Sequence, residues 1–571
     1  MKPTALTYFF IQSIQISELL DLEPAQALEQ LSREKSLYHF IQELAASDLY
    51  AQALSEEFAA ADQVMALDSF RQLRSALSLN WGRFLTELAK LAQSIDADRA
   101  AQWLLLADRI IADPKCNVQL RKTLLKGPCA KEYSALQAKY LREDAHVVYP
   151  TSPYRKCAGH VVSNADYSAI DGVITSTVTT SIRVVDHVLN PSNALLRELY
   201  LPLGRCIAFV DSNVDEHFGE AIQTYFKHHA IELHYKVHRA MEVDKDISKV
   251  ETILGELKQL GAARNEPILI VGGGVLADIA GFAAALYHRN TPYVMLNTSI
   301  VSGIDAGPSP RTCSDGYGYK NLFGAYHAPI LSITDRSFFK TLHPGWIRHG
   351  IAEIIKMGGV KDLALIELLE AAGPDLVKSA FGTVATEPDS EIDRLSKKIL
   401  GLALKSYVES EYDNLYETHQ CRPHAFGHTW SPGFEIASGM LHGHAVSVGM
   451  GFNGYLSYRM GWINDSEFKR LLAVIQLFDL SLWHDILLDF DIVWSAQQKM
   501  IEKRGGNLSA PMPKGRLGQC GYLNELSRAD MEAAILEYQA ICQGYPRGGI
   551  GVEPLCTDVG LEDPGTIGHA R

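Results

Sequence analysis

The amino-acid sequence predicts a chain of three folded parts: a helical segment, an α/β domain and a second helical domain. Between about 173 and 274, short runs rich in β-branched residues alternate with helical segments, which is typical of an α/β domain with a mostly parallel sheet. In residues 1–145 apolar residues recur near a 3.6-residue period, and glycine is nearly absent. From about 335 onward, long amphipathic segments are broken by glycines. We therefore predict an all-helical extension over 1–150, an α/β domain over 151–335, a helical domain over 336–548 and a flexible Gly/Pro-rich tail over 549–571.

Within the α/β region the predicted elements follow a regular order. Strands are expected over 173–189, 206–211, 231–237 and 267–274, and helices over 215–228 and 247–260. The second of these strands ends in Asp211, and the last runs into three consecutive glycines.

The helical extension over 1–150 has two interpretations. It is either a module for partner binding or oligomerisation, or an appendage without chemistry of its own. We favour the appendage, because no catalytic constellation is present in this segment.

Composition limits the classes of partner. The chain has 571 residues, too many for one compact core, and 47% of them are hydrophobic and 21% charged. The formal net charge of −14 argues against a nucleic-acid partner or an anionic membrane, because both reward surfaces rich in Lys and Arg. A phosphorylated substrate stays compatible, since a pocket can be basic within an acidic protein.

We expect a cytoplasmic protein. No continuous apolar run reaches the roughly 18 residues that a membrane helix needs, and the N-terminus lacks the charged-then-apolar order of a secretion signal. The nine cysteines are scattered singly, without a C-x-x-C pair, which is typical of reduced thiols rather than of a disulfide framework or a structural zinc finger.

A glycine-rich turn, Gly272-Gly273-Gly274, joins a buried strand to a helix. Glycines let backbone N–H groups approach a pyrophosphate, and a helix N-terminus favours its charge. The turn departs from G-x-G-x-x-G, so a tight connection without a ligand also explains it. Asp211 ends an earlier strand, where its carboxylate can accept a bond from a ribose hydroxyl or cap the next helix.

A Glu and two His form a candidate metal site. Glu353 and Lys356 lie three residues apart on one face of an apolar helical run, which an ordinary salt bridge also explains. His428 and His442 each lie beside a glycine at the start of a predicted helix. Together these residues fit a His₂Glu zinc site with a position left open for substrate. His444 is a competing ligand, and spacing alone does not choose between it and His442.

Several basic and amide side chains lie near glycine-rich turns and suit a phosphate pocket, although each alone is an ordinary surface charge. They are Arg289, Arg311, Lys320, Asn321, Arg504 and Lys514.

Motifs along the chain occur in a fixed order and resemble a known family. They are VGGGVLADIAGFAAALYHRN (271–290), IDAG (304–307), KN (320–321), AEIIK (352–356), FGH (426–428) and HG-x-AV (442–446). This order is similar to that of the sugar-phosphate cyclase family, whose best-known member is 3-dehydroquinate synthase. The resemblance covers roughly residues 175–525 and leaves the first 150 unmatched.

The resemblance implies an NAD-binding α/β domain, a helical C-terminal domain, a zinc ion in the cleft, for which Co²⁺ can substitute, and a homodimer. By position, the metal ligands are Glu353, His428 and His442, which favours His442 over His444. The NAD-binding positions are Asp211, Glu242, Lys245, Gly273, Gly274, Asp278, Thr298, Ser299, Lys320 and Thr341, with Asp246 and Lys249 as an alternative to Glu242 and Lys245. The positions that contact substrate and phosphate are Arg289, Asp305, Arg311, Asn321, Lys356 and Lys514.

Three features of the sequence indicate which branch of the family it resembles. Arg311-Thr312-Cys313 stands where the family usually has a KTG-x-N motif, so the charge is kept and its geometry changes. Ala425 and Pro432 replace the Asn and second His of dehydroquinate synthases. The strings AFGHTWSP (425–432) and EYDNL (411–415) are instead similar to the sedoheptulose 7-phosphate cyclases, which include 2-epi-5-epi-valiolone, 2-epi-valiolone and demethyl-4-deoxygadusol synthases.

The resemblance therefore implies conversion of sedoheptulose 7-phosphate to a carbocycle of the 2-epi-5-epi-valiolone type. The steps it implies are transient oxidation by NAD, elimination of phosphate, reduction and an intramolecular aldol reaction. Alternatives are the other two cyclases and then 3-dehydroquinate synthase. From different classes, we keep a metal-dependent alcohol dehydrogenase, which would form net NADH, and a non-catalytic binding protein.

Overall fold

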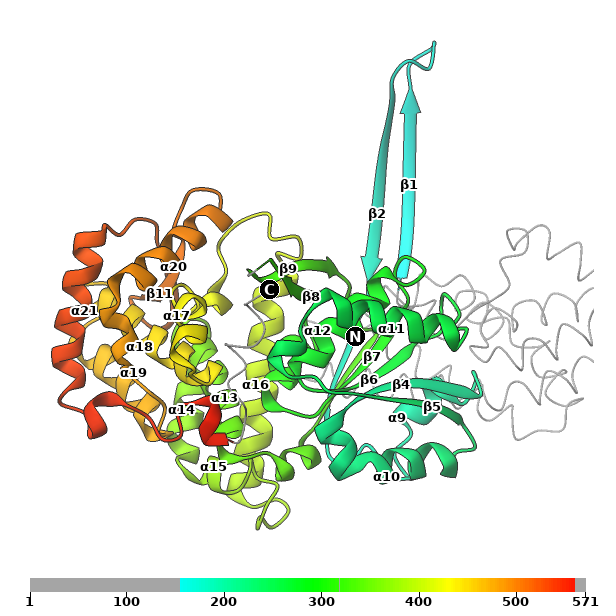
Figure 1. The fold of residues 1–571 in the computed structure, drawn as a ribbon, viewed down its shortest axis with the longest axis horizontal. Coiled ribbons are helices and arrows are strands. Elements are labelled where there is room, and N and C mark those ends of the chain that lie inside the picture. Colours follow the sequence, from blue (N-terminus) through cyan, green and yellow to red (C-terminus); the bar gives the residue numbers. More distant parts are fainter. Residues whose placement is uncertain (1–154, 318, 560–571) are drawn as a thin grey trace, which may run out of the picture. The chain divides into compact units, whose positions relative to one another are not determined.

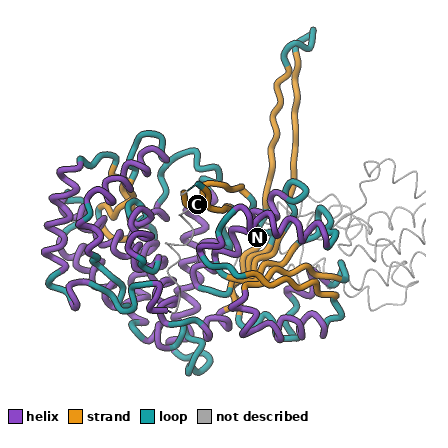
Figure 2. The backbone as a smooth tube through the Cα atoms, in the orientation of Figure 1, coloured by secondary structure: helices purple, strands orange, loops and turns teal. Residues whose placement is uncertain are grey.

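The computed structural model describes residues 155–317 and 319–559, so the predicted helical extension lies outside the described residues. Residues 157–193 and 205–559 form one compact unit, and helix α9 (Leu195–Tyr200) lies in the segment between them. Figures 1 and 2 show strands gathered in the first half of this unit and helices in the second. The expected α/β domain followed by a helical domain is confirmed.

The α/β domain is built on a six-stranded sheet in which every neighbouring pair is parallel. Its order is β3 (Ser181–Val185), β10 (Leu331–Asp335), β7 (Tyr293–Asn297), β6 (Ile268–Gly272), β4 (Arg205–Asp211) and β5 (Glu232–His238). All residues of β6, β7 and β10 are buried, as expected for a parallel sheet covered on both faces.

Helices cover both faces of this sheet. Figure 1 shows α10 (Ser212–His228) on one face and α11 (Ile247–Gln259) and α12 (Gly274–Leu286) on the other. Asp211 and Asp246 cap α10 and α11 by accepting bonds from backbone N–H groups, which satisfies donors that a helix start leaves open. The strands and helices predicted between 206 and 274 are confirmed.

The strand-like stretch predicted over 173–189 is two strands in different sheets. Strand β2 (Ile170–Val178) pairs only with β1 (Arg155–Ser163) in a two-stranded ribbon, whereas β3 joins the main sheet. Another antiparallel pair, β8 (Arg311–Gly316) and β9 (Tyr319–Tyr326), forms a hairpin that carries several of the predicted site residues.

The helical domain surrounds one long, buried helix, α13 (Pro344–Val360), whose residues from Gly350 onward are all buried. Its other elements are α14 (Leu363–Ala372), α15 (Asp375–Lys378), α16 (Glu391–Tyr412), α17 (Ser431–Ser438), α18 (His442–Arg459), α19 (Asp465–Leu477), α20 (Phe490–Lys503), β11 (Ala510–Lys514), β12 (Arg516–Leu523) and α21 (Arg528–Cys542). None of the described helices is long and apolar enough to cross a membrane.

The first part of the predicted tail is hydrogen-bonded to the helical domain. The N–H of Gly551 donates to Ser481 Oγ at 2.9 Å, and the N–H of Leu441 donates to the Pro554 carbonyl at 2.8 Å. These bonds fix the chain beside the start of α18. Residues 560–571 lie outside the described residues.

A close approach between α18 and α13 depends on Gly443. A Cβ atom at this position would lie 2.5 Å from the Cα of His349 on α13, closer than side-chain atoms pack. The missing side chain therefore lets the first turn of α18 rest directly on α13.

Gly443→Ala is expected to destabilise the fold by about 1–3 kcal/mol, because the added methyl must push the two helices apart. Gly401→Ala is the matched control: Gly401 lies within α16 and its Cβ would meet nothing within 4 Å. That control should stabilise by roughly 0.5–1 kcal/mol, since alanine is the better helix former. Thermal unfolding of both variants measures the difference, and equal midpoints would contradict this packing.

Candidate active site

Three side chains meet in the helical domain with the spacing of a zinc site. The Nε2 atoms of His428 and His442 are 3.3 Å apart. Oε1 of Glu353 lies 3.4 Å from Nε2 of His442 and 3.7 Å from Nε2 of His428. Ligand atoms about 2.0–2.2 Å from a tetrahedral zinc lie roughly 3.3–3.6 Å from one another, so the cluster fits that ion and leaves a fourth position for substrate.

Hydrogen bonds turn both imidazoles toward the cluster. Nδ1 of His442 lies 2.9 Å from Oε2 of Glu435, and Nδ1 of His428 lies 3.1 Å from the Phe426 carbonyl. Both partners are acceptors, so each Nδ1–H donates, which turns each Nε2 toward the metal position. This arrangement of outer partners is typical of histidine ligands to zinc.

The local backbone positions each of the three ligands. Glu353 projects from buried α13, and His442 is the first residue of α18. His428 was expected to start a helix, but α17 begins three residues later at Ser431. It lies instead in a turn where Gly427 has φ +80°, a conformation that favours glycine.

His444, the competing ligand in the sequence, is not part of the cluster. It is fully buried, and its Nδ1 lies 2.9 Å from Ser481 Oγ. Two residues along α18 place it on a different side of the helix from His442.

Burial and charge set the protonation of the three ligands. Burial opposes ionisation of Glu353, yet the Lys356 ammonium and then His428 hold its pKa well below the usual range. Burial and Lys356 lower the pKa of His428 to about 4. Burial also disfavours the charged form of His442, but Glu435 outweighs it and raises that pKa to about 10.

Lys356 links the cluster to a second acidic group. Its ammonium forms an ion pair with Glu353, and its Nζ lies 3.5 Å from Oδ2 of Asp305. Asp305 belongs to a short π-helical turn, η3 (Ser302–Ala306), which follows β7. The side chain of Lys356 is 2% exposed and that of Asp305 27%, so Asp305 is the more accessible group of the pair.

Many of the predicted NAD-binding residues meet at one sheet edge. Strands β4, β6, β7 and β10 end there, and the carboxyl edge of a parallel sheet is where such folds bind nucleotides. The residues at or after these ends are Asp211, Gly273, Gly274, Thr298, Ser299 and Thr341. Gly273 is the N-cap of α12, and the N–H of Thr298 donates to the Gly272 carbonyl at 3.1 Å.

Two ion pairs complete this edge. Lys245 Nζ lies 2.6 Å from Oδ2 of Asp278, and Lys320 Nζ lies 3.1 Å from Oε1 of Glu242. Asp246, the alternative in the sequence, caps α11 as Asp211 caps α10. Both ion pairs join residues of the predicted set, and the choice between Glu242 with Lys245 and Asp246 with Lys249 stays a prediction.

Lys320 joins the two halves of the candidate site. Its ammonium also lies 3.0 Å from Oε1 of Glu435, the carboxylate that orients His442. One lysine from the β8–β9 hairpin therefore connects the glycine-turn region to the metal cluster.

The remaining predicted substrate contacts are arranged differently. Asn321 lies on the same hairpin, where its N–H donates to Asp315 Oδ1 at 2.7 Å. Lys514 is exposed, with its Nζ 4.5 Å from the centre of the Trp462 ring. Arg289 is exposed and follows α12, which starts at the glycine turn, so it lies at the opposite sheet edge, where β7 begins. The structure does not bring Lys514 or Arg289 to the metal cluster within one chain.

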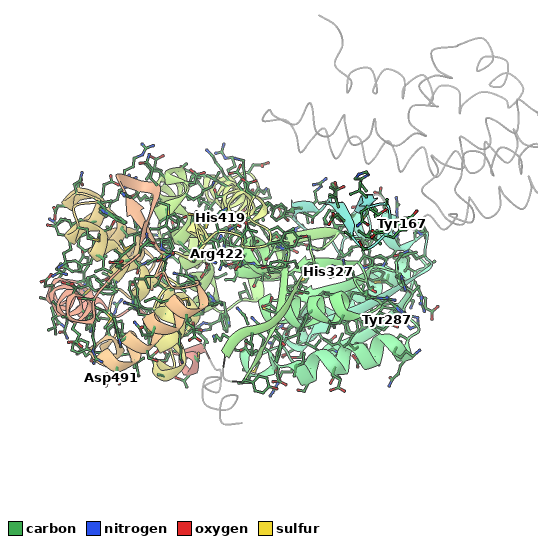
Figure 3. All side chains as sticks on the ribbon, turned by 90° about the horizontal axis from the view of Figure 1, so that it is seen from above. Tyr167, Tyr287, His327, His419, Arg422 and Asp491 are labelled. Atoms are coloured by element: carbon green, nitrogen blue, oxygen red, sulfur yellow. The ribbon has the colours of Figure 1, made fainter. Side chains whose placement is uncertain are left out.

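Four side chains at the site carried no signal that singled them out in the sequence. Glu435 and Tyr407 look like ordinary members of amphipathic helices, because their contacts are with segments distant in the chain. Arg422, labelled in Figure 3, donates to Oε1 of Glu417 at 3.0 Å. Lys503 ends α20 and lies within electrostatic reach of Arg422.

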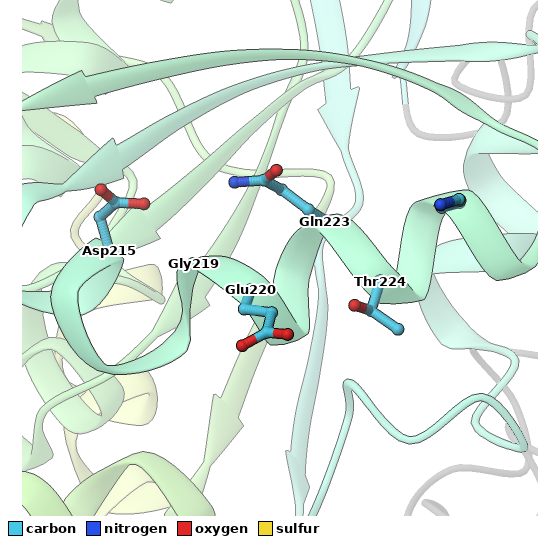
Figure 4. Close-up of a pocket in the computed structure, with 6 residues that line it drawn as sticks. Asp215, Gly219, Glu220, Gln223 and Thr224 are labelled. Atoms are coloured by element: carbon cyan, nitrogen blue, oxygen red, sulfur yellow. The ribbon is translucent and has the colours of Figure 1, made fainter.

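A separate shallow pocket lies along α10, outside this site. Figure 4 shows Asp215, Gly219, Glu220, Gln223 and Thr224 lining it. All of its lining residues come from one helix, and none belongs to the predicted sets.

Comparison with known proteins gives consistent matches over the described domains. Residues 236–349 match the family model described as 3-dehydroquinate synthase N-terminal, and residues 350–500 match that described as 3-dehydroquinate synthase C-terminal. Demethyl-4-deoxygadusol synthase of Trichormus variabilis is 36% identical over 371 residues, which are 65% of this chain and 90% of the relative. 2-Epi-5-epi-valiolone synthase of Streptomyces albus is 33% identical over 371 residues, covering 64% of this chain and 89% of the relative.

A solved structure shares this fold. ValA, the 2-epi-5-epi-valiolone synthase of Streptomyces hygroscopicus subsp. jinggangensis 5008, was solved with NAD⁺ and Zn²⁺ bound. It superimposes with a TM-score of 0.59 at 32% identity, covering 64% of this chain and 98% of ValA.

Zinc binding is expected to release about one proton per site at pH 8. Without metal, His442 is protonated at this pH because its pKa is about 10, whereas His428, with a pKa of about 4, is already neutral. Zinc requires a neutral imidazole, so it displaces the Nε2 proton of His442. Apparent affinity should then rise tenfold per pH unit up to about pH 10. Calorimetric titrations in buffers of different ionisation enthalpy count the proton; a count of zero would contradict this assignment.

Glu435→Gln is expected to weaken zinc binding about 10- to 100-fold, because the amide keeps the size of the side chain but loses the charge that orients His442. The control is Glu370→Gln, which removes an exposed carboxylate paired with Arg470 at 2.7 Å. Competition with a chromogenic chelator measures both affinities. An unchanged affinity in Glu435→Gln would show that the carboxylate has no part in metal binding.

Proposed function

Because the chain belongs to the 3-dehydroquinate synthase-like family of sugar phosphate cyclases, we propose that it is a sedoheptulose 7-phosphate cyclase that uses NAD and zinc and forms a 2-epi-5-epi-valiolone-type product. The observation that carries this proposal is the Glu353–His428–His442 cluster, arranged as a zinc site in a chain 32% identical to ValA.

Glu353, His428 and His442 would hold the zinc, whose chemistry is to acidify a substrate hydroxyl bound at its open position. Lys356 keeps the Glu353 carboxylate ionised, and Glu435 orients the imidazole of His442 so that its Nε2 faces the other two ligands. These side chains therefore fix the charge of the site before substrate binds.

The residues at the carboxyl edge of the sheet would hold NAD, whose chemistry is to accept and return a hydride. Gly273 and the first turn of α12 offer backbone N–H groups and a positive helix end to a pyrophosphate. Lys320 keeps this edge beside the metal cluster through its contact with Glu435. A short path between the two centres suits a reaction in which hydride leaves and returns to the same substrate.

A group of three cations supports a phosphorylated substrate: Arg422, Lys503 and Arg504. Burial, and then the charge of Arg311, lower the pKa of Arg422. Burial and the charge of Arg422 lower the pKa of Lys503, and they lower that of Arg504 to about 10. Cations that repel one another gain stability when an anion binds between them. We assign the phosphate to this group.

Asp305 and Lys356 would contact the sugar itself. Asp305 offers a partly exposed carboxylate as an acceptor for hydroxyl groups, and Lys356 holds it in place at 3.5 Å. We extend the proposal to a homodimer, as the family resemblance implies. Only contacts between two copies would then bring Arg289 near a substrate.

Demethyl-4-deoxygadusol is a second candidate product, favoured by the 36% identity with the synthase of Trichormus variabilis. Synthesis of 3-dehydroquinate is disfavoured by Ala425 and Pro432, which replace polar side chains next to the metal turn.

The test is a reaction of the purified chain with sedoheptulose 7-phosphate, NAD and Zn²⁺. We expect release of one phosphate per carbocyclic product without accumulation of NADH, and mass spectrometry with NMR identifies the product. Glu353→Gln should be inactive, while Glu370→Gln should match the unaltered chain. Net NADH without phosphate release would indicate a dehydrogenase instead. Turnover only of 3-deoxy-arabino-heptulosonate 7-phosphate would indicate a dehydroquinate synthase.

A further inference from the structure

Arg311 is neutralised inside the protein. Its guanidinium forms an ion pair with Glu411, and it donates to Oε1 of Glu417 and to the Tyr407 hydroxyl, both at 2.9 Å. Glu411 is also bound by Ser309, whose hydroxyl donates to it at 3.2 Å, and its side chain is 4% exposed. Two carboxylates therefore contact this guanidinium before any substrate arrives, and it shares one of them, Glu417, with Arg422.

The same guanidinium reaches the candidate active site through Tyr407. The Tyr407 hydroxyl accepts a bond from Arg311, and burial and then the negative charge of Asp305 raise the pKa of Tyr407 well above its usual range. The Nζ of Lys356 lies 5.6 Å from the centre of the Tyr407 ring and 3.5 Å from Asp305. Lys356 is thus held between the ring of Tyr407 and the carboxylate of Asp305.

Arg311 has different charged neighbours from the three cations assigned to phosphate, Arg422, Lys503 and Arg504. Burial disfavours the charged form of Arg311, but Tyr407 and the carboxylates of Glu411 and Asp305 raise its pKa well above the usual range. Arg311 contacts two carboxylates, Arg422 contacts one, and Arg504 donates to the carbonyls of Leu508 and Ser509. An incoming phosphate would therefore displace fewer carboxylates from Arg422 and Arg504 than from Arg311.

We propose that Arg311 is a positioning residue that fixes the Tyr407 side chain beside Lys356, the partner of Asp305, and that it does not bind the substrate phosphate. This departs from the role that the family resemblance implies for the cation at this position. The geometry explains why arginine is present: its planar fork contacts Glu411, Glu417 and Tyr407 at once, which a lysine ammonium on a single stem cannot reproduce. The expected effect of Arg311 on catalysis rests on the proposed function, whereas the positioning of Tyr407 rests on these contacts.

Four variants of the full chain test the proposal: Arg311→Lys, Tyr407→Phe, the double variant, and Arg470→Lys as control. Arg470 belongs to an exposed ion pair with Glu370. We expect Arg311→Lys and Tyr407→Phe each to lower kcat about tenfold, and the double variant to lower it no further, because both changes break the same hydrogen bond between the guanidinium and the hydroxyl. Inhibition by inorganic phosphate should stay within about twofold of the unaltered enzyme in all four.

Two results would overturn the proposal. One is a tenfold or greater weakening of phosphate inhibition in Arg311→Lys with Tyr407→Phe unchanged, which would make Arg311 a phosphate ligand. The other is a roughly hundredfold loss of kcat in the double variant, which would make the two residues independent. If the unaltered chain releases no phosphate from sedoheptulose 7-phosphate, the proposed function fails. The structural part of the proposal is then tested by the thermal unfolding midpoints of the same variants. If Arg311 and Tyr407 are coupled, the double variant should be no less stable than Arg311→Lys.

Discussion

The structure depends on one buried carboxylate. Glu353 is 1% exposed within the central helix of its domain, where an unpaired negative charge would be strongly destabilising. Lys356, one turn further along the same helix, supplies the positive charge, and the open side of the carboxylate faces two imidazoles. Gly443 and Gly427 make that second contact possible, one by allowing α18 to rest on α13 and the other by a left-handed turn before His428.

The β8–β9 hairpin connects this centre to the α/β domain. Lys320 on β9 contacts Glu242 beside the glycine turn and Glu435 beside His442. Arg311 at the start of β8 contacts α16 through Tyr407 and Glu411. Two residues of one short hairpin therefore contact the helical domain. These contacts hold the sheet edge that is assigned to NAD at a fixed position relative to the metal cluster. Such a relation suits a reaction in which oxidation and reduction occur on one bound substrate.

Local sequence features account for much of the fold and for half of the site. Strands such as β6 were predictable because β-branched runs end in glycines, and Glu353 with Lys356 because their spacing places them on one helix face. The choice of His442 over His444 needed the family resemblance, since it depends on which face of α18 meets α13. Glu435 and Tyr407 act only through contacts across the fold, so no local pattern marks them. Splitting of the stretch 173–189 into two sheets likewise depends on tertiary pairing.

One metal position is expected, and anomalous diffraction at the zinc edge would locate it. Crystals of the chain with zinc should show a peak about 2.0–2.2 Å from Glu353 and from Nε2 of both His428 and His442. A peak bound by His444 instead, or no peak beside Glu353 at saturating zinc, would show that this buried carboxylate does not organise the metal centre.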